Sequence, residues 1–270
     1  MSTKHVFDDA TGLVEKACLG VASTNPDLRF FAHHKVLYNA AHPRDKVAIL
    51  AGGGAGHEPA FSGLVGSGLV TVAVSGDVFA SPSSKQICSG VDLAPTDKGI
   101  VTIVLNYTGD CLNFGLASEK ARSAFHSEGK GRDIEMVNVG DDVSVGRSKG
   151  GLVGRRGLTG AAFTAKVLGA ASEKGDDVQK IAHLGRTMVK NFVTVGSSLD
   201  HCHVPGRSTD PKERGALSQS AVEIGMGIHN EPGAKHIENK PSGEDLIKEM
   251  LELLLREDDP ERSFVKFNKD

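Results

Sequence analysis

The sequence predicts an α/β protein with a mixed, largely parallel sheet flanked by helices. Short apolar runs rich in β-branched residues recur along the chain, and longer segments with helical spacing separate several of them. Such alternation favours parallel strands joined by crossover helices. The expected strands cover residues 47–51, 69–74, 100–105, 134–139, 192–195 and 222–228. The expected helices cover residues 83–93, 113–125, 159–174 and 178–190.

The C-terminal part of the chain departs from this alternation. Residues 243–256 are acidic with a leucine-rich face, which predicts a helix, and residues 263–267 predict the start of a strand. A length of 270 residues allows one large domain or two small ones. We expect a first α/β subdomain over residues 1–200. We expect the start of a second, incomplete α/β subdomain over residues 201–270.

Composition argues against several classes of protein. The chain has 31 basic and 34 acidic residues, no tryptophan and only two tyrosines, which argues against a nucleic-acid-binding surface. Its four cysteines lie far apart without paired spacing, as is usual for reduced thiols. The N-terminus lacks the apolar core of a signal peptide, and no stretch has the roughly 20 apolar residues of a membrane span. We therefore expect a cytoplasmic protein that binds neither nucleic acid nor membrane.

The motif GGGAGHEP, residues 52–59, is the strongest indication of a binding site. It follows the first expected strand, and its glycines leave the backbone almost bare up to His57 and Glu58. Bare amides and an acid/base group at the carboxyl end of a strand are typical of a small-molecule site in an α/β sheet. A tight structural turn is the alternative, but it leaves the histidine and the glutamate unexplained.

Neither standard phosphate-binding motif fits these glycines. A G-x-G-x-x-G pattern needs glycine at position 57 or 59, where the chain has histidine and proline. The G-K-S/T ending of a P-loop does not occur in the chain. A nicotinamide-dependent oxidoreductase is therefore a weak alternative.

Two further motifs follow expected strands. GMGIHNEPG, residues 225–233, again places a histidine, His229, beside a glutamate among glycines. Two converging histidines suit carbonyl or hydroxyl chemistry. NYTGD, residues 106–110, ends in Asp110. This carboxylate suits either of two roles, as the N-cap of the next helix or as the acceptor of a proton from a substrate hydroxyl.

Three other loops carry polar side chains. The sequence HCH within residues 196–203 invites a zinc interpretation, but adjacent residues cannot easily all face one ion, and no second cluster has ligand spacing. Residues 75–82 either line a pocket or form a structural turn. Residues 147–156 either contact phosphate or form a solvated surface loop.

Taken together, these motifs resemble those of the dihydroxyacetone (glycerone) kinase family. The resemblance runs over nearly the whole chain, and six motifs occur in the family's order: GGGAGHEPAFSG, SGDVFASPS, NYTGD, GDDVSVGRSKGGLVGRRGLTG, GSSLDHCHVPGR and GMGIHNEPG. The chain is similar to the substrate-binding K domain of the ATP-dependent eukaryotic enzymes.

The resemblance implies roles for particular residues. It implies a covalent hemiaminal between the carbonyl of dihydroxyacetone and His229. It also implies that His57 transfers a proton at a substrate hydroxyl, and that Asp110 orients or deprotonates this hydroxyl. The backbone positions that the resemblance places around the substrate are Gly54, Ala55 and Gly56. Imidazole adds to ketoses and aldehydes but not to glycerol, which has no carbonyl, so such a tether selects the substrate class.

The chain departs from the family pattern at two places. Leu105 stands where many relatives have a lysine that touches the substrate, so the resemblance implies a substrate-binding position here that lacks the lysine contact. In the kinases the K domain continues beyond the equivalent of residues 264–267, and a separate helical L domain binds ATP and magnesium. We therefore expect a truncated chain that binds no cofactor itself and is inactive without an ATP-bearing L domain.

The resemblance also bears on partners. It implies dihydroxyacetone as the substrate, leaves glyceraldehyde open as a second one, and implies a homodimer. The alternative from another class is a truncated, non-catalytic protein that senses a ketose or docks a partner. The intact histidines favour the kinase, whereas the missing L domain favours the alternative.

Overall fold

The structure is a computed structural model that describes residues 4–7, 9–127, 129, 131–150 and 153–267. The chain divides into two compact units, each built from segments that are separated in sequence. The larger unit comprises Gly12–Val139 and Thr159–Val189; the smaller unit comprises residues up to Thr11, Gly140–Leu158 and the residues from Lys190 onward. This division differs from a single boundary near residue 200, because the chain leaves the larger unit after β6 and returns to it for two helices.

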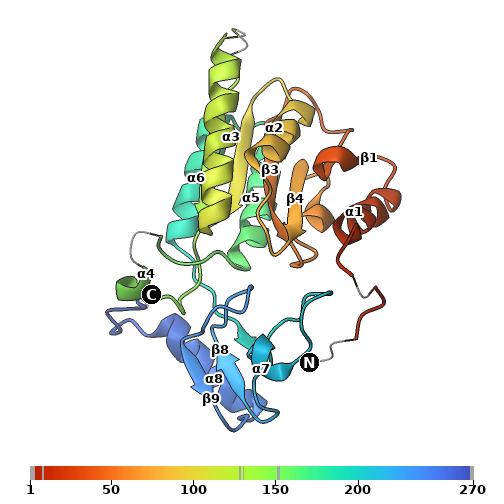
Figure 1. The fold of residues 1–270 in the computed structure, drawn as a ribbon. Helices are drawn as coiled ribbons and strands as arrows, with labels where there is room; N and C mark the ends of the chain where they lie inside the picture. The colour runs from red at the N-terminus through yellow and green to blue at the C-terminus, as the bar shows by residue number, and fades with distance from the viewer. Residues whose placement is uncertain (1–3, 8, 128, 130, 151–152, 268–270) are drawn as a thin grey trace. The chain divides into compact units, whose positions relative to one another are not determined.

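The larger unit is built on a six-stranded sheet with the strand order β1-β2-β4-β3-β5-β6 (Figure 1). The strands are β1 (Leu28–Phe31), β2 (Val36–Asn39), β3 (Ala48–Ala55), β4 (Val72–Val78), β5 (Ile100–Leu105) and β6 (Ile134–Val139). The four strands β3 to β6 run parallel, whereas β1 and β2 are antiparallel to their neighbours at one edge. The predicted mixed, largely parallel sheet is therefore confirmed.

Helices cover both faces of this sheet. α2 (Ser84–Leu93) and α3 (Thr108–Ser127) pack on one face, and α5 (Gly160–Glu173) and α6 (Val178–Lys190) pack on the other (Figure 1). The remaining helix of this unit, α1 (Leu13–Ser23), packs beside β1 and β4. The four helices predicted for this part of the chain are therefore present, and α3 begins at Thr108 rather than at residue 113.

The core fixes where the end of β3 and the start of α3 lie. β3 and β5 are almost entirely buried, because helices cover both faces of the sheet. Leu50, Val74 and Phe114 belong to the apolar cluster beneath α2 and α3. The Phe114 ring lies over the glycine backbone of β3, since a Cβ on Gly52 would come within 3.0 Å of it. This contact holds the first half of α3 beside the glycine-rich end of β3.

The smaller unit contains a three-stranded antiparallel sheet, with the order β7-β8-β9, and a C-terminal helix. Its elements are α4 (Arg147–Gly150), β7 (Ser197–Ser198), α7 (Pro211–Arg214), β8 (Val222–Ile224), β9 (Lys235–Ile237) and α8 (Gly243–Leu255). The helix predicted at residues 243–256 is α8. The Ser242 hydroxyl caps α8 by accepting a hydrogen bond from the Asp245 amide at 3.1 Å.

Four strands, β1, β2, β7 and β9, escape the sequence pattern, and two predicted strands are wrong. β1 and β2 have only four residues each, and the short 3-10 turn Ala32–His34 joins them, so neither gives a periodic signal of useful length. Residues 192–195 were expected to form a strand. They contribute only a single bridge, between Thr194 and Asp142.

The strand predicted to start at residues 263–267 is also wrong, because this segment forms no strand. The Phe264 ring instead lies under the guanidinium groups of Arg147 and Arg155, which are 4.5 and 4.2 Å from its centroid. Arg147 also donates a hydrogen bond from Nη2 to the Ser263 carbonyl at 2.8 Å. Contacts to these arginines, rather than sheet pairing, fix the conformation of the segment.

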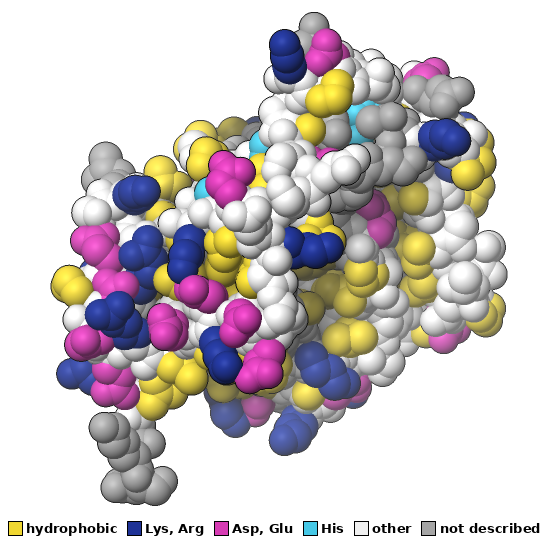
Figure 2. Space-filling model, turned by 90° about the horizontal axis from the view of Figure 1, so that it is seen from below, with side chains coloured by type: hydrophobic (Ala, Val, Ile, Leu, Met, Phe, Trp, Pro, Cys, Tyr) yellow, Lys and Arg dark blue, Asp and Glu magenta, His cyan; other side chains and the backbone are white. Residues whose placement is uncertain are grey.

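The surface carries charges of both signs. Figure 2 shows basic and acidic side chains interleaved on one face, with hydrophobic side chains between them. This distribution agrees with the nearly balanced count of 31 basic and 34 acidic residues. Within the part of the chain that the structure describes, no helix is both long enough and apolar enough to cross a membrane.

Candidate functional site

In the larger unit, the candidate site lies at the carboxyl edge of the parallel strands. β3, β4 and β5 run parallel, so the segments that follow them meet at the same edge. These segments are residues 54–58, 79–81 and 106–110. The pairing of β3 with β4 shifts by one residue here, from Gly53 opposite Ser75 to Ala55 opposite Val78. The extra residue in β4 bends the strand and leads into a turn over the glycine backbone.

This turn lies close to the bare backbone of the glycine motif. A Cβ on Gly54 would come within 2.8 Å of the Ala80 amide nitrogen, and a Cβ on Gly56 within 2.7 Å of the Phe79 ring. Gly56 also has a φ of 99°, which L side chains rarely adopt. Ala55 packs its side chain in an apolar cluster with residues of α1, so it offers a ligand only its backbone. Glycine is therefore required on both sides of Ala55.

Asp110 lies inside the first turn of α3. The helix begins at Thr108, so the interpretation of Asp110 as its N-cap is wrong. The carboxylate is only 5% exposed and lies beside the backbone of β3, because a Cβ on Gly53 would be 3.8 Å from Oδ2. The Ser81 hydroxyl approaches the same turn, 2.7 Å from the position of a Cβ on Gly109. A buried carboxylate and a hydroxyl thus lie next to backbone that carries no side chain.

The His57 imidazole stacks on the Phe79 ring at this edge. Their centroids are 5.0 Å apart and their planes differ by 7°. The exposed Glu58 carboxylate closes the same turn by accepting a hydrogen bond from the Gly56 amide at 3.1 Å. Leu105, the last residue of β5, is 7% exposed and adds an apolar side chain. The edge therefore combines an imidazole, a carboxylate and bare backbone with an apolar wall.

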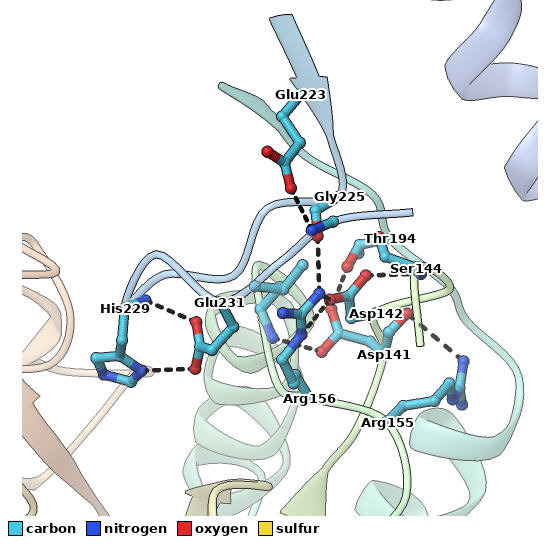
Figure 3. Close-up of polar contacts among 12 residues, drawn as sticks. Asp141, Asp142, Ser144, Arg155, Arg156, Thr194, Glu223, Gly225, His229 and Glu231 are labelled. Carbon is cyan, nitrogen blue, oxygen red and sulfur yellow. Dashed lines mark hydrogen bonds and ion pairs between the residues drawn. The ribbon is translucent and has the colours of Figure 1, made fainter. Parts of the chain in front are cut away.

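In the smaller unit, His229 lies in a turn that Glu231 organises (Figure 3). The Glu231 carboxylate accepts a hydrogen bond from the His229 backbone amide at 2.9 Å, and its other oxygen lies 3.1 Å from Nδ1 of the same histidine. The Glu231 carbonyl accepts a further bond from the Gly227 amide at 2.9 Å. An ionised carboxylate can only accept, so Nδ1 carries the proton and Nε2 of the neutral imidazole carries the lone pair.

The surroundings of Glu231 make it a stronger acid. Burial raises the pKa of Glu231, but the hydrogen bonds from the His229 side chain and from nearby backbone amides outweigh burial and lower it from 4.5 to about 2. The carboxylate is therefore ionised at all but strongly acidic pH. It can therefore accept the Nδ1 hydrogen bond whenever the His229 imidazole is neutral.

A buried ion pair holds the start of the His229 turn. Arg156 donates from Nε to Asp142 Oδ2 at 2.8 Å and from Nη2 to the Gly225 carbonyl at 2.7 Å (Figure 3). Asp142 is fully buried, and its Oδ1 accepts a hydrogen bond from the Ser144 amide at 2.8 Å. The expectation of a solvated surface loop at residues 147–156 is therefore wrong for Arg156, whose side chain is 12% exposed.

The segment that contains the HCH sequence supports the same turn. Asn230 has a φ of 66°, a conformation that asparagine tolerates better than most residues. Its Oδ1 accepts a hydrogen bond from the Cys202 amide at 2.7 Å, and its Nδ2 donates to the Cys202 carbonyl at 3.1 Å. No three His, Cys, Asp or Glu side chains among the described residues are arranged to hold a metal ion.

The expected site residues fall in both units. The larger unit brings His57, Asp110, Leu105 and the backbone of residues 54–56 to one edge of its sheet, whereas His229 belongs to the smaller unit. The sequence reasoning did not assign a role to Phe79 or to Arg156. The sequence signals for both are a position in a loop after an expected strand and a place within the motifs SGDVFASPS and GDDVSVGRSKGGLVGRRGLTG.

The fold and these side chains define a class of protein. It is an α/β protein whose imidazole and carboxylate groups lie where such folds bind small molecules. The chain belongs to the Dak1 domain family, whose family model matches residues 19–269. A dihydroxyacetone kinase of Pichia angusta is 43% identical over 278 residues, which cover 99% of this chain and 44% of that kinase. The chain thus spans less than half the length of the curated relatives it matches.

Solved structures share the fold. The crystal structure of the dihydroxyacetone kinase of C. freundii in its native form aligns with a TM-score of 0.80 and 33% identity, covering 93% of this chain and 45% of that chain. The dihydroxyacetone kinase operon co-activator Dha-DhaQ aligns with a TM-score of 0.77 and 30% identity, covering 88% of this chain and 70% of that chain. One of these proteins is a kinase, and the other is an operon co-activator.

Proposed function

We propose that this chain binds dihydroxyacetone covalently and presents it for phosphorylation, as the substrate-binding part of a dihydroxyacetone kinase. The observation that carries the proposal is the geometry of His229, whose Nδ1 lies 3.1 Å from the Glu231 carboxylate, an arrangement that favours the neutral tautomer with its lone pair on Nε2. Membership of the Dak1 domain family and 43% identity to a dihydroxyacetone kinase support the substrate class.

The proposed step is addition of the imidazole to the ketone. The lone pair on Nε2 of His229 forms a bond to the carbonyl carbon, and the π electrons of the C=O bond move to the oxygen, which takes a proton. The imidazole gives up its Nδ1 proton, which the Glu231 carboxylate accepts, and the carbonyl oxygen gains one proton, so the net charge of imidazole and ketose together does not change. No water is lost, so the product is a hemiaminal. The ionised carboxylate stabilises the positive charge that develops on the ring.

The proposal assigns His57 and Asp110 to the substrate hydroxyl. Asp110 orients and deprotonates the hydroxyl that attacks the phosphoryl group, and His57 transfers a proton beside it. The position of the Asp110 carboxylate beside the Gly53 backbone, at the carboxyl edge of the parallel strands, supports this role. The backbone of residues 54–56 surrounds the ketose, and Leu105 contributes an apolar contact.

The nucleotide is assigned to another domain. The chain has no P-loop motif, and the described residues offer no group of three ligands for a metal ion. On the resemblance to the kinases, we propose that a separate L domain supplies ATP and magnesium. A homodimer, and glyceraldehyde as a second carbonyl substrate, stay predictions of the family resemblance.

Carbon-13 NMR tests the covalent step. Dihydroxyacetone labelled at its carbonyl carbon should give a protein-bound tetrahedral signal, and native mass spectrometry should show a gain of one whole dihydroxyacetone, since no water leaves. His229→Ala should abolish both signals. His236→Ala, at an exposed histidine of the same unit, should keep them. Folded wild-type protein that gives neither signal at millimolar ketose would contradict the proposal.

A non-catalytic, ketose-sensing protein is the second candidate function. The similarity to an operon co-activator, at a TM-score of 0.77, favours it. Adding the ATP-bearing L domain of a related kinase distinguishes the two candidates. The kinase proposal expects dihydroxyacetone phosphate to form, whereas the sensing proposal expects an adduct without turnover.

A further inference from the structure

The backbone of Phe79 is strained. Its φ is 57°, in the left-handed region where a bulky side chain is an outlier. A turn that needs only this conformation is usually made with glycine or asparagine. Hydrogen bonds keep the turn in this form: the Phe79 amide donates to the Ala55 carbonyl at 2.9 Å, and the Ala80 amide donates to the Asp77 carbonyl at 3.1 Å.

An ion pair anchors the far side of the same turn. The Asp77 carboxylate pairs with Nζ of Lys35, which also lies 3.4 Å from the Glu15 carboxylate of α1. The Lys35 side chain is 15% exposed and that of Asp77 is 77% exposed, so the pair is shielded from water only on its Lys35 side. The strained turn is therefore tied to β3 on one side and to α1, through Lys35, on the other.

This strained turn presents the Phe79 ring to His57. The two rings are nearly parallel, with planes 7° apart and centroids 5.0 Å apart. The same ring excludes a side chain at Gly56, whose Cβ would come within 2.7 Å of it. An offset parallel stack fixes the plane of the imidazole and leaves both ring nitrogens at its edge.

We propose that Phe79 is a positioning residue for His57, an inference that rests on the proposed role of His57 in the ketose site. The aromatic ring restricts the imidazole to one plane and covers one of its faces. The nitrogen that transfers the proton is then directed at the substrate hydroxyl before the substrate arrives, which avoids ordering the ring during the reaction. The left-handed backbone at Phe79 is what brings the aromatic ring to that place.

A packing role alone would have different consequences. Leucine fills a similar apolar volume, so it would replace Phe79 in a packing role with little loss. Leucine has no π face for the imidazole, so it would not replace Phe79 in a positioning role. Tyrosine keeps the ring and should preserve both roles.

A double-mutant cycle tests whether Phe79 acts through His57. Turnover of dihydroxyacetone, with an ATP-bearing L domain supplied, is compared for the wild type, Phe79→Leu, His57→Ala and the double variant. Phe79→Leu should lower kcat by about tenfold while KM changes by less than about threefold. It should have no further effect once His57 is alanine, because the two residues act as a unit. Phe79→Tyr should keep at least about half of the wild-type kcat.

Proton–carbon NMR of the histidine rings gives a readout that does not depend on turnover. The His57 Cε1–H signal, assigned by its absence in His57→Ala, should move in Phe79→Leu because the ring current of the stacked neighbour is lost. Phe79→Tyr should leave it in place.

A second pair of variants separates the effect of backbone strain at Phe79 from the effect of losing its aromatic ring. Phe79→Gly should melt at a higher temperature than Phe79→Ala, since only alanine must hold a side chain at positive φ. Both variants should lose turnover to a similar extent, because both lack the ring.

Two results would overturn the positioning role of Phe79. One is strict additivity of the two substitutions in the cycle. The other is wild-type kcat in Phe79→Leu together with an unmoved His57 signal. Wild-type protein that neither binds the ketose nor supports turnover would instead refute the proposed function, and the positioning role would fall with it.

Discussion

At the scale of single residues, the His229 turn is a local construction. Glu231 accepts two hydrogen bonds from a residue only two positions earlier, and positive φ at Gly225 and Asn230 shapes the chain around them. The reactive tautomer of His229 thus depends mainly on its own turn. This explains why the sequence indicated the turn: its glycines, histidine and glutamate are adjacent, and no long-range contact is needed to pair them.

Glu231→Gln should slow adduct formation with dihydroxyacetone by about 10- to 100-fold, because a neutral amide stabilises the charge on the imidazole less well. Time-resolved carbon-13 NMR measures this rate. Glu238→Gln, at a carboxylate that is 76% exposed in the same unit, is the matched control and should react at the wild-type rate. Equal rates in Glu231→Gln and the control would remove Glu231 from the mechanism.

The same variant should change stability in acid. The pKa of Glu231 is lowered from 4.5 to about 2, so its carboxylate stabilises the folded state fully above about pH 4.5, and this contribution is lost as the pH falls toward 2. Urea unfolding across that window should therefore depend less on pH in Glu231→Gln than in the wild type. An unchanged pH dependence would mean that the pair does not persist in solution.

At the scale of elements, the conformation at the end of β3 depends on its pairing with β4. β3 and β5 were predictable because buried parallel strands are continuous apolar runs. The stacking of His57 on Phe79 was not predictable, because it depends on a one-residue shift in the pairing of β3 with β4. Apolar periodicity carries no information about such a shift.

Gly56→Ala should destabilise the larger unit by roughly 1–3 kcal/mol, because the new Cβ meets the Phe79 ring and the backbone stays at a φ of 99°. Urea unfolding monitored by circular dichroism gives the free energy of unfolding. Gly66→Ala is the matched control, since a Cβ there has no neighbour within 4 Å, and it should change the free energy by less than about 0.5 kcal/mol. Equal effects would show that the turn moves freely away from the glycine backbone.

At the scale of the whole molecule, segments far apart in sequence build each unit. Arg156 reaches the Gly225 carbonyl across 69 residues of chain, and its partner Asp142 is completely buried. The sequence shows two adjacent aspartates and two adjacent arginines but not which of them pair. The boundary expected near residue 200 failed to describe the units for the same reason, because long-range pairing and not composition decides which segments belong together.

Asp142→Ala should destabilise the smaller unit by about 3–5 kcal/mol, because it leaves the mostly buried Arg156 without its charged partner. Hydrogen exchange followed by mass spectrometry should show faster exchange in β8 and the His229 turn, while β3 and β5 of the larger unit stay protected. Asp258→Ala removes an exposed pair with Arg256 in the same unit and should leave the exchange pattern of the wild type unchanged. Faster exchange in both units of Asp142→Ala would mean that they unfold together.

The one-residue shift between β3 and β4 also limits how this site can diverge. Side chains alternate along a strand, so a residue gained or lost between Ser75 and Val78 would send the following side chains to opposite faces and carry Phe79 away from His57. Substitutions leave this alternation intact. Substitutions at constant loop length can therefore change the ligand preference of the site. Insertions and deletions in β4 would instead separate Phe79 from His57.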